Sequence, residues 1–124
     1  RKVVTLLFVY NARSGTLNAL LEGIHKIVSP STYSCKLCTL THGAFQEREL
    51  WKAFRQSTAL NMEFYHRDEF LQNYMAERND QWEFPVILTK TETGLNVFLS
   101  KEELEILNTE AALIQAIKVK LKTL

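Results

Sequence analysis

A nearly continuous apolar run near the start of the chain limits most strongly what it can fold into. Val3 to Tyr10 is interrupted only by Thr5 and is rich in β-branched and aromatic residues. Successive side chains of a strand point to opposite faces of its sheet, so an apolar run of this kind must be covered on both faces. The run therefore predicts a central strand with further elements packed on either side of the sheet.

The pattern after this strand predicts a helix. Asn11 to Gly15 is typical of a turn, Ser14 or Thr16 can cap the helix, and Ser29-Pro30-Ser31 ends it. Apolar residues between these signals recur at helical spacing and form one stripe. They are Leu17, Leu20, Leu21, Ile24 and Val28.

Helix and strand patterns continue to alternate in the middle of the chain. A helix is expected from about Phe45 to Gln56, with Leu50, Trp51 and Phe54 facing inward. Residues 62–66 alternate between apolar and polar side chains, as a strand does.

A short helix and a polar loop follow this strand. Asp68 is placed to cap the helix, which runs through Tyr74, and residues 75–83 form an exposed loop. Trp82, within that loop, is a candidate for an exposed contact with a partner.

The last third of the chain carries a hairpin and two helices. Phe84 to Leu88 begin a strand. Glu92-Thr93-Gly94 then forms a turn into a second strand over 95–99. Ser100 and Glu103 form a capping box that starts one helix. Thr109 caps the final helix, in which Ile114, Ile117 and Leu121 face inward.

Length, composition and charge limit the class of protein. The chain of 124 residues is 46% hydrophobic, which predicts one α/β domain over residues 1–124 with a mixed sheet of about four strands flanked by helices. A net charge of +1 gives no indication of nucleic acid binding. The longest apolar run is far shorter than the ~20 residues of a membrane helix. Two cysteines in a chain of this length favour a reducing compartment, so we expect a cytoplasmic protein that does not bind membranes.

The two cysteines, Cys35 and Cys38, are separated by two residues and followed by His42. In one hypothesis they cycle between dithiol and disulfide, and the more exposed cysteine attacks while its neighbour resolves the mixed disulfide. A free thiol with a pKa of ~8.5 is mostly protonated at neutral pH, so Lys36, His42 or a helix N-terminus would have to stabilise the thiolate. His42 is then the candidate proton carrier. Cys35, Cys38 and His42 are the candidate catalytic residues.

A second hypothesis is a metal site, with zinc as the candidate cofactor. Cys-x2-Cys is a common half-site, and His42 adds a third potential ligand to Cys35 and Cys38. A closed tetrahedral site needs a fourth ligand, which His66, His25 or a carboxylate would supply through folding. In a third hypothesis both cysteines are small buried hydrophobic residues without chemistry, since Leu37 and Leu40 make the segment partly apolar. The sequence leaves all three open.

A different class of function uses the ends of the first two strands. Asn11, Arg13 and Ser14 follow the first strand, where ligands usually meet open α/β sheets, and Arg13 could bind an anion. His66 ends the second strand and could form part of the same cleft. The alternative to thiol chemistry is therefore a non-enzymatic module that binds a small molecule, an anion or a protein there. The sequence decides neither between these classes nor whether the chain is an enzyme.

The order strand-helix-strand-helix-strand-strand-helix, together with Phe84-Pro85-Val86-Ile87-Leu88, resembles the thioredoxin-like fold. In that family a proline opens the third strand, usually after a cis peptide, and lies beside the thiol site. The resemblance implies a thioredoxin-like domain in which Pro85 shapes the substrate groove next to Cys35 and Cys38. Thioredoxins place the first cysteine directly after the first strand, whereas here a helix is expected between Tyr10 and Cys35.

The segments Val9-Tyr10-Asn11-Ala12 and Cys35 to Gly43 also resemble a family of small uncharacterised bacterial proteins, some of which carry a GTPase label. The chain lacks the G-x-x-x-x-G-K-[ST] loop whose amides and lysine bind phosphates. The leading expectation is a small thiol-based protein that uses Cys35 and Cys38 for disulfide exchange or metal binding, with an unknown protein or small molecule as partner.

Overall fold

The fold is described from a computed structural model. The structure describes residues 5–11, 16–28, 35–42, 47–58, 60–74, 82–92 and 94–123. The expected turn at 11–15 and most of the expected loop at 75–83 lie outside these residues.

A mixed sheet forms the centre of the described residues. Its strands are β1 (Thr5–Tyr10), β2 (Asn61–His66), β3 (Val86–Thr91) and β4 (Gly94–Leu99). Their order is β2-β1-β3-β4, with β1 parallel to β2 and the other neighbours antiparallel. The expected α/β domain with about four strands is confirmed, and so is the central place of the first strand.

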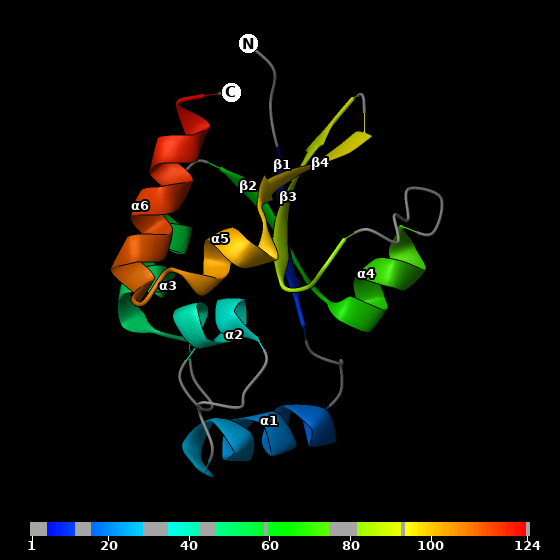
Figure 1. Ribbon diagram of the computed structural model, residues 1–124, viewed down its shortest axis with the longest axis vertical. Helices are drawn as coiled ribbons and strands as arrows, with labels where there is room; N and C mark the ends of the chain where they lie inside the picture. The colour runs from blue at the N-terminus through cyan, green and yellow to red at the C-terminus, as the bar shows by residue number, and fades with distance from the viewer. Residues whose placement is uncertain are drawn as a thin grey trace.

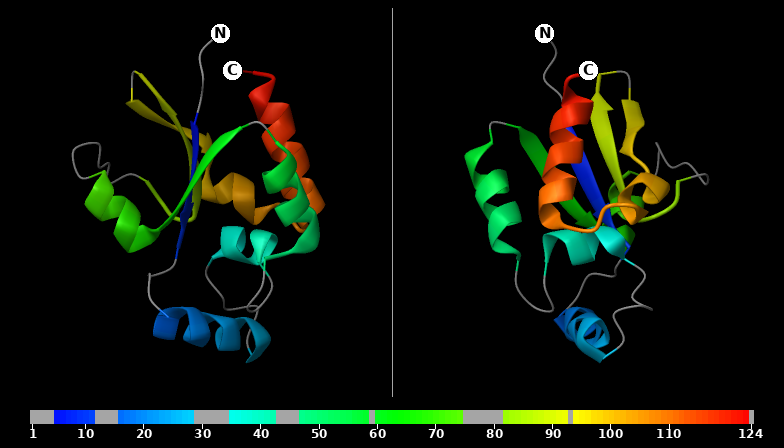
Figure 2. Two further views of the ribbon diagram at one scale, coloured as in Figure 1. Left: turned by 180° about the vertical axis from the view of Figure 1, so that it is seen from behind. Right: turned by 60° about the vertical axis from the view of Figure 1, so that its left-hand side comes forward.

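Helices cover both faces of this sheet (Figures 1 and 2). The described residues form the helices α1 (Thr16–Val28), α2 (Lys36–Thr41), α3 (Glu49–Ser57), α4 (Arg67–Asn73), α5 (Lys101–Glu105) and α6 (Glu110–Leu121). α2, α3, α5 and α6 lie on one face, and α4 lies on the other. Within the described segments, no helix combines the length and the apolar character that a membrane crossing requires.

Alternate side chains of β1 contribute to two separate cores. Leu6, Phe8 and Tyr10 belong to the larger core, beneath α2, α3, α5 and α6. Leu7 and Val9 point the other way and pack with Phe70 of α4 and neighbouring side chains. All five side chains are buried, because a strand covered on both faces has no solvent-exposed side.

Local signals at the helix starts are mostly confirmed. Ser100 and Glu103 form the expected capping box, and the Thr109 hydroxyl accepts the Ala112 N–H. The cap of α4 was assigned wrongly to Asp68. His66 is the capping residue and exchanges hydrogen bonds with Glu69, because the second strand runs directly into this helix.

The segment before β3 matches the expected proline position. Phe84–Pro85 is a cis peptide, and the buried Pro85 lies one residue before the strand. Trp82 is half-buried, with its ring centroid 5.6 Å from that of Phe70. Trp82 is therefore not the fully exposed side chain that its loop position suggested, since its ring extends the smaller core, and a partner contact there stays a prediction.

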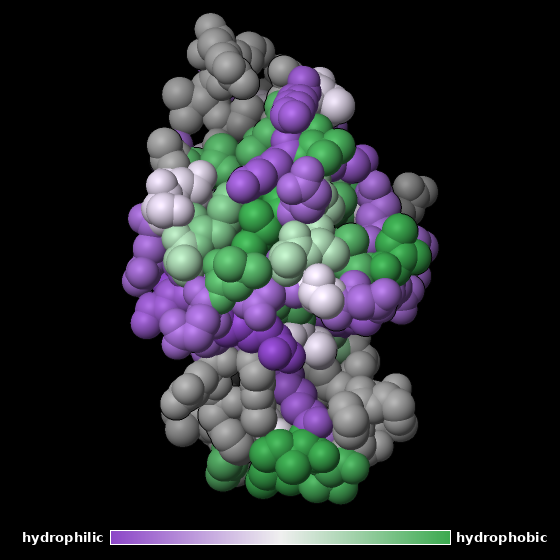
Figure 3. Space-filling view, turned by 90° about the vertical axis from the view of Figure 1, so that its left-hand side faces the viewer, coloured by the Kyte–Doolittle hydropathy of each residue, from purple (hydrophilic) through white to green (hydrophobic). Residues whose placement is uncertain are grey.

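The side chains of the α1 apolar stripe that the structure describes are exposed, although such a stripe normally faces a core. The helix lies beyond the end of β1, clear of both sheet faces (Figure 1), and Figure 3 shows its apolar surface at that end of the molecule. Its exposed side chains include Leu20, Leu21, Ile24, Ile27 and Val28. The buried positions of this helix include Gly23. The larger core is already covered by the other helices, which leaves no apolar surface there for α1.

One inward residue of the third helix was also assigned wrongly. Trp51 is fully buried and Phe54 is partly buried, but Leu50 is 49% exposed. Leu50 and Trp51 are adjacent in the helix, so their side chains point in directions about 100° apart. Only the direction taken by Trp51 faces the sheet.

Exposed α1 leucines should contribute little to folding stability. We expect Leu21→Ala to change the free energy of unfolding by no more than about 0.5 kcal/mol, because Leu21 is 56% exposed. The matched control is Leu104→Ala in α5, where a fully buried leucine is lost and about 2–5 kcal/mol is expected. Urea unfolding of both variants measures the difference. Equal losses would mean that the α1 stripe is part of the core.

Candidate functional site

Cys35 and Cys38 form a disulfide at the start of α2. Their Cα atoms are 5.3 Å apart, within the range that a disulfide spans. Cys35 is the capping residue of the helix, and Cys38 lies in its first turn. The sequence pair thus becomes a closed ring that contains one sulfur–sulfur bond.

The sulfur of Cys35 accepts two main-chain hydrogen bonds. The Cys38 N–H donates to it over 3.2 Å, as the geometry of the helix start dictates. The Asn11 N–H donates to it over 3.3 Å and comes from a residue 24 positions earlier in the chain. Donors of this kind favour a negatively charged acceptor over a neutral one, so they are positioned to stabilise a Cys35 thiolate.

The contact with Asn11 places Cys35 at the carboxyl end of β1. Asn11 directly follows the strand, and α1 lies within the stretch of chain between Asn11 and Cys35. The chain therefore leaves the strand end, forms α1, and returns to the same end before α2 begins. The expected separation of Cys35 from the first strand holds along the sequence but not in space.

Pro85 lies at this same end of the sheet. Val86 pairs with Val9 in the antiparallel register of β1 and β3, so the residue before Val86 lies at the level where β1 ends. The disulfide and Pro85 therefore both lie at the end of the sheet where β1 stops.

Both cysteines are buried, and Cys38 is the more exposed, at 7% against 1% for Cys35. They belong to the larger core, together with Leu37 and Leu40 of the same helix. Burial among leucines is what the hypothesis of inert cysteines predicts. A sulfur–sulfur bond is not, because that hypothesis treats the cysteines as two free thiols.

The expected metal site of Cys35, Cys38 and His42 is not formed. Across the described ranges, no group of three or more His, Cys, Asp or Glu residues gathers as metal ligands would. The two sulfurs are bonded to each other, and Nδ1 of His42 lies 2.8 Å from Oγ1 of Thr41. Within the described residues, the structure therefore gives the zinc hypothesis no support.

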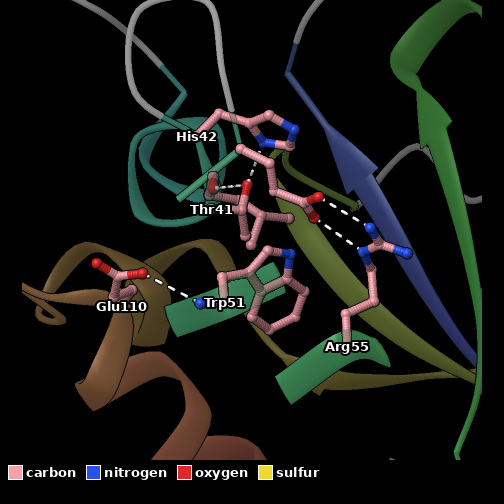
Figure 4. Close-up of polar contacts among 7 residues, drawn as sticks. Thr41, His42, Trp51, Arg55 and Glu110 are labelled. Atoms are coloured by element: carbon pink, nitrogen blue, oxygen red, sulfur yellow. Dashed lines mark hydrogen bonds and ion pairs between the residues drawn. The ribbon is translucent and has the colours of Figure 1, made fainter. Parts of the chain in front are cut away.

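His42 belongs to a polar cluster next to the disulfide helix (Figure 4). Thr41 donates its hydroxyl hydrogen to the Leu37 carbonyl over 3.0 Å. Since a threonine hydroxyl has one hydrogen, Nδ1 of His42 carries its own hydrogen and donates it to Thr41. The Nε2 atom of a neutral His42 is then left with a lone pair that can accept a proton.

Burial shifts the pKa values within this cluster. Burial lowers the pKa of His42, an effect that the nearby Glu47 charge opposes. Burial also raises the pKa of the Tyr10 hydroxyl, which is hydrogen-bonded to Thr41, to about 12. Arg55 binds the Glu47 carboxylate through two hydrogen bonds of 2.8 Å and lowers the pKa of that group. Sequence patterns did not single out Tyr10, Thr41, Glu47 and Arg55, which come from separate segments.

Two of the candidate binding residues, Asn11 and His66, lie at the ends of the neighbouring strands β1 and β2, and each has a partner within the protein. Asn11 accepts a 2.9 Å hydrogen bond from Nη1 of Arg67 through its side-chain oxygen. His66 lies at the end of β2, and its Nδ1 is 2.9 Å from Glu69. Arg13 and Ser14 lie outside the described residues. Arg67 follows His66 directly, and the sequence places it in the same possible cleft but favours a solvated side chain. The structure instead shows its hydrogen bond to Asn11.

Comparison of the chain with models of protein families gives no match. Curated proteins and solved structures give no match either. The geometry of the site is therefore what supports a functional assignment.

The lowered pKa of His42 predicts acid destabilisation. Below pH ~6.5 the unfolded chain takes up a proton at this residue before the folded chain does. The associated stability is present above that value and is lost as the pH falls through the folded pKa. We expect His42→Gln to flatten the fall in unfolding free energy as the pH decreases below ~6.5. Urea unfolding across this range checks it, and an unchanged slope would contradict it.

Proposed function

We propose that this chain is a thiol–disulfide oxidoreductase that uses Cys35 and Cys38. The observation that carries the proposal is the disulfide between them, with two main-chain donors directed at the sulfur of Cys35. By a chain-entropy estimate, closing a ring of four residues stabilises the folded chain by about 2 kcal/mol, against about 3 kcal/mol for a loop of fifteen residues. The 46% hydrophobic chain also has a substantial core, so a purely structural disulfide is the weaker explanation.

The architecture supports a thioredoxin-like assignment. The sheet order β2-β1-β3-β4, the parallel β1–β2 pair and the following hairpin and helix correspond to the order of elements in that family. Cys35 lies beside the carboxyl end of β1, and Pro85 lies at the same end of the sheet. α1 is then an insertion between the first strand and the cysteine pair, and Pro85 shapes the substrate groove.

The proposed reaction transfers two electrons from a substrate dithiol to the protein disulfide. A substrate thiolate attacks one protein sulfur, the Cys35–Cys38 bond breaks, and the other protein sulfur leaves as a thiolate. A second substrate thiolate then attacks the substrate sulfur of the mixed disulfide. The substrate leaves as a disulfide, and the released protein thiolates take up protons. His42 is the proposed proton carrier, through Nε2.

The two protein sulfurs take different parts in this exchange. Cys35 holds the two main-chain donors, so its sulfur is the better leaving thiolate. Cys38 is the more exposed of the two and is therefore the sulfur that the substrate attacks. In the reverse direction Cys38 attacks a substrate disulfide and Cys35 resolves the mixed disulfide. A transient catalytic disulfide of this kind is compatible with the cytoplasm.

Loss of either cysteine should abolish catalysed exchange. We expect Cys35→Ser and Cys38→Ser to reduce the rate of exchange between a dithiol peptide and glutathione disulfide at least ~100-fold, because neither variant can form the internal disulfide. Val97→Ser, at an exposed position of β4, introduces the same side chain and should keep the rate. Exchange at the uncatalysed rate by the unmodified chain would overturn the proposal.

The attacked sulfur can be identified separately. The oxidised chain is mixed with glutathione, quenched with acid and alkylated, and the glutathione adduct is located by tandem mass spectrometry. We expect the adduct on Cys38 and the alkyl group on Cys35, because Cys35 is the leaving thiolate. An adduct on Cys35 with the alkyl group on Cys38 would mean that Cys35 is attacked and Cys38 leaves. The proposed exchange activity would still hold.

A further inference from the structure

The two N–H donors to the Cys35 sulfur are held in place by different parts of the structure. The Cys38 N–H lies three residues away in the same helical turn, so local geometry is sufficient to place it. The Asn11 N–H comes from beyond the end of β1. Its direction depends on how the chain is held where the strand stops, because the ladder of sheet hydrogen bonds no longer fixes it there.

Arg67 supplies a fixing contact at this point. Tyr10 and His66 are opposite each other at the ends of the parallel strands β1 and β2. Asn11 and Arg67 are the next residues along each chain, and Nη1 of Arg67 donates to Oδ1 of Asn11 over 2.9 Å. The contact joins residues 56 positions apart and ties the exit of β1 to the start of α4.

We propose that Arg67 is a positioning residue for the disulfide chemistry. It holds the Asn11 side chain so that the Asn11 main-chain N–H points at the Cys35 sulfur, and it thereby stabilises the Cys35 thiolate that forms when the disulfide opens. The role rests on the proposed exchange activity and adds a residue that does not touch either sulfur.

The hydrogen-bonding partner of Arg67 favours this role over an ordinary surface ion pair. A solvated ion pair contributes little and tolerates variation in geometry. Here the planar guanidinium bonds a neutral amide oxygen, which fixes the orientation of the Asn11 residue. A thiolate accepts a hydrogen bond more strongly than a neutral thiol does, so a misdirected Asn11 N–H would weaken the charged form more.

The test measures Cys35 alone, in Cys38→Ser protein, through the pH dependence of the ultraviolet absorbance of its thiolate, which needs no reagent to reach the buried sulfur. We expect Arg67→Gln to raise the midpoint of this profile by about half to one pH unit, as partial loss of a hydrogen bond to a charged group would. Asn11→Ala keeps the main-chain N–H but removes the acceptor for Arg67, and should raise the midpoint by a similar amount.

The double variant separates positioning from a direct effect of the positive charge. If Arg67 acts through Asn11, Asn11→Ala combined with Arg67→Gln shifts the midpoint no further than either change alone. Additive shifts would overturn the positioning role, because Arg67 would then act on the sulfur independently. Arg67→Lys, which retains a charge and a donor, should return the midpoint at least halfway to that of the parent protein.

A cation outside the site provides the control for general loss of structure. Lys120→Gln removes an ammonium that lies 3.0 Å from the Glu103 carboxylate, and should leave the midpoint unchanged. An unchanged midpoint in both Arg67→Gln and Arg67→Lys would also overturn the inference. This titration requires no turnover, so a shifted midpoint without catalysed exchange would contradict the proposed function and not this role. Catalysed exchange with an unshifted midpoint would do the opposite.

Discussion

Burial of β1 on both faces is the constraint on which the rest of this structure depends. Five consecutive residues, Leu6 to Tyr10, are buried, and they supply side chains to two cores. A strand in this position must have neighbours on both edges and helices above and below it. Its carboxyl end is consequently a fixed point, and both the disulfide and the Arg67–Asn11 contact are attached there.

The electrostatics of the site come from main-chain groups more than from charged side chains. The Cys35 sulfur accepts hydrogen bonds from the main-chain N–H groups of Asn11 and Cys38. Nδ1 of His42 forms a hydrogen bond with Thr41 and none with the sulfur. Main-chain donors held by a sheet end and a helix start do not have to reorganise when charge develops. Preorganised dipoles of this kind stabilise charge at a low cost in reorganisation.

Much of the fold could be predicted from local patterns, for physical reasons that particular elements illustrate. The apolar run of β1, the hairpin at Gly94 and the caps at Ser100 and Thr109 each depend on residues close in sequence. α1 shows the limit of this approach. Its helical spacing was correctly identified, but the spacing cannot say whether an apolar stripe finds a core that still has room. The same limit applies to Leu50.

The sequence by itself determined that the chain forms a layered α/β domain and that its sulfur chemistry is confined to Cys35 and Cys38. Tertiary structure alone decided that the Asn11 N–H meets the Cys35 sulfur and that Arg67 meets the Asn11 side chain. The physical reason is distance along the chain. Spacing records contacts over a few residues, whereas the contacts that define this site join segments 24 and 56 positions apart, which only the packed sheet brings together.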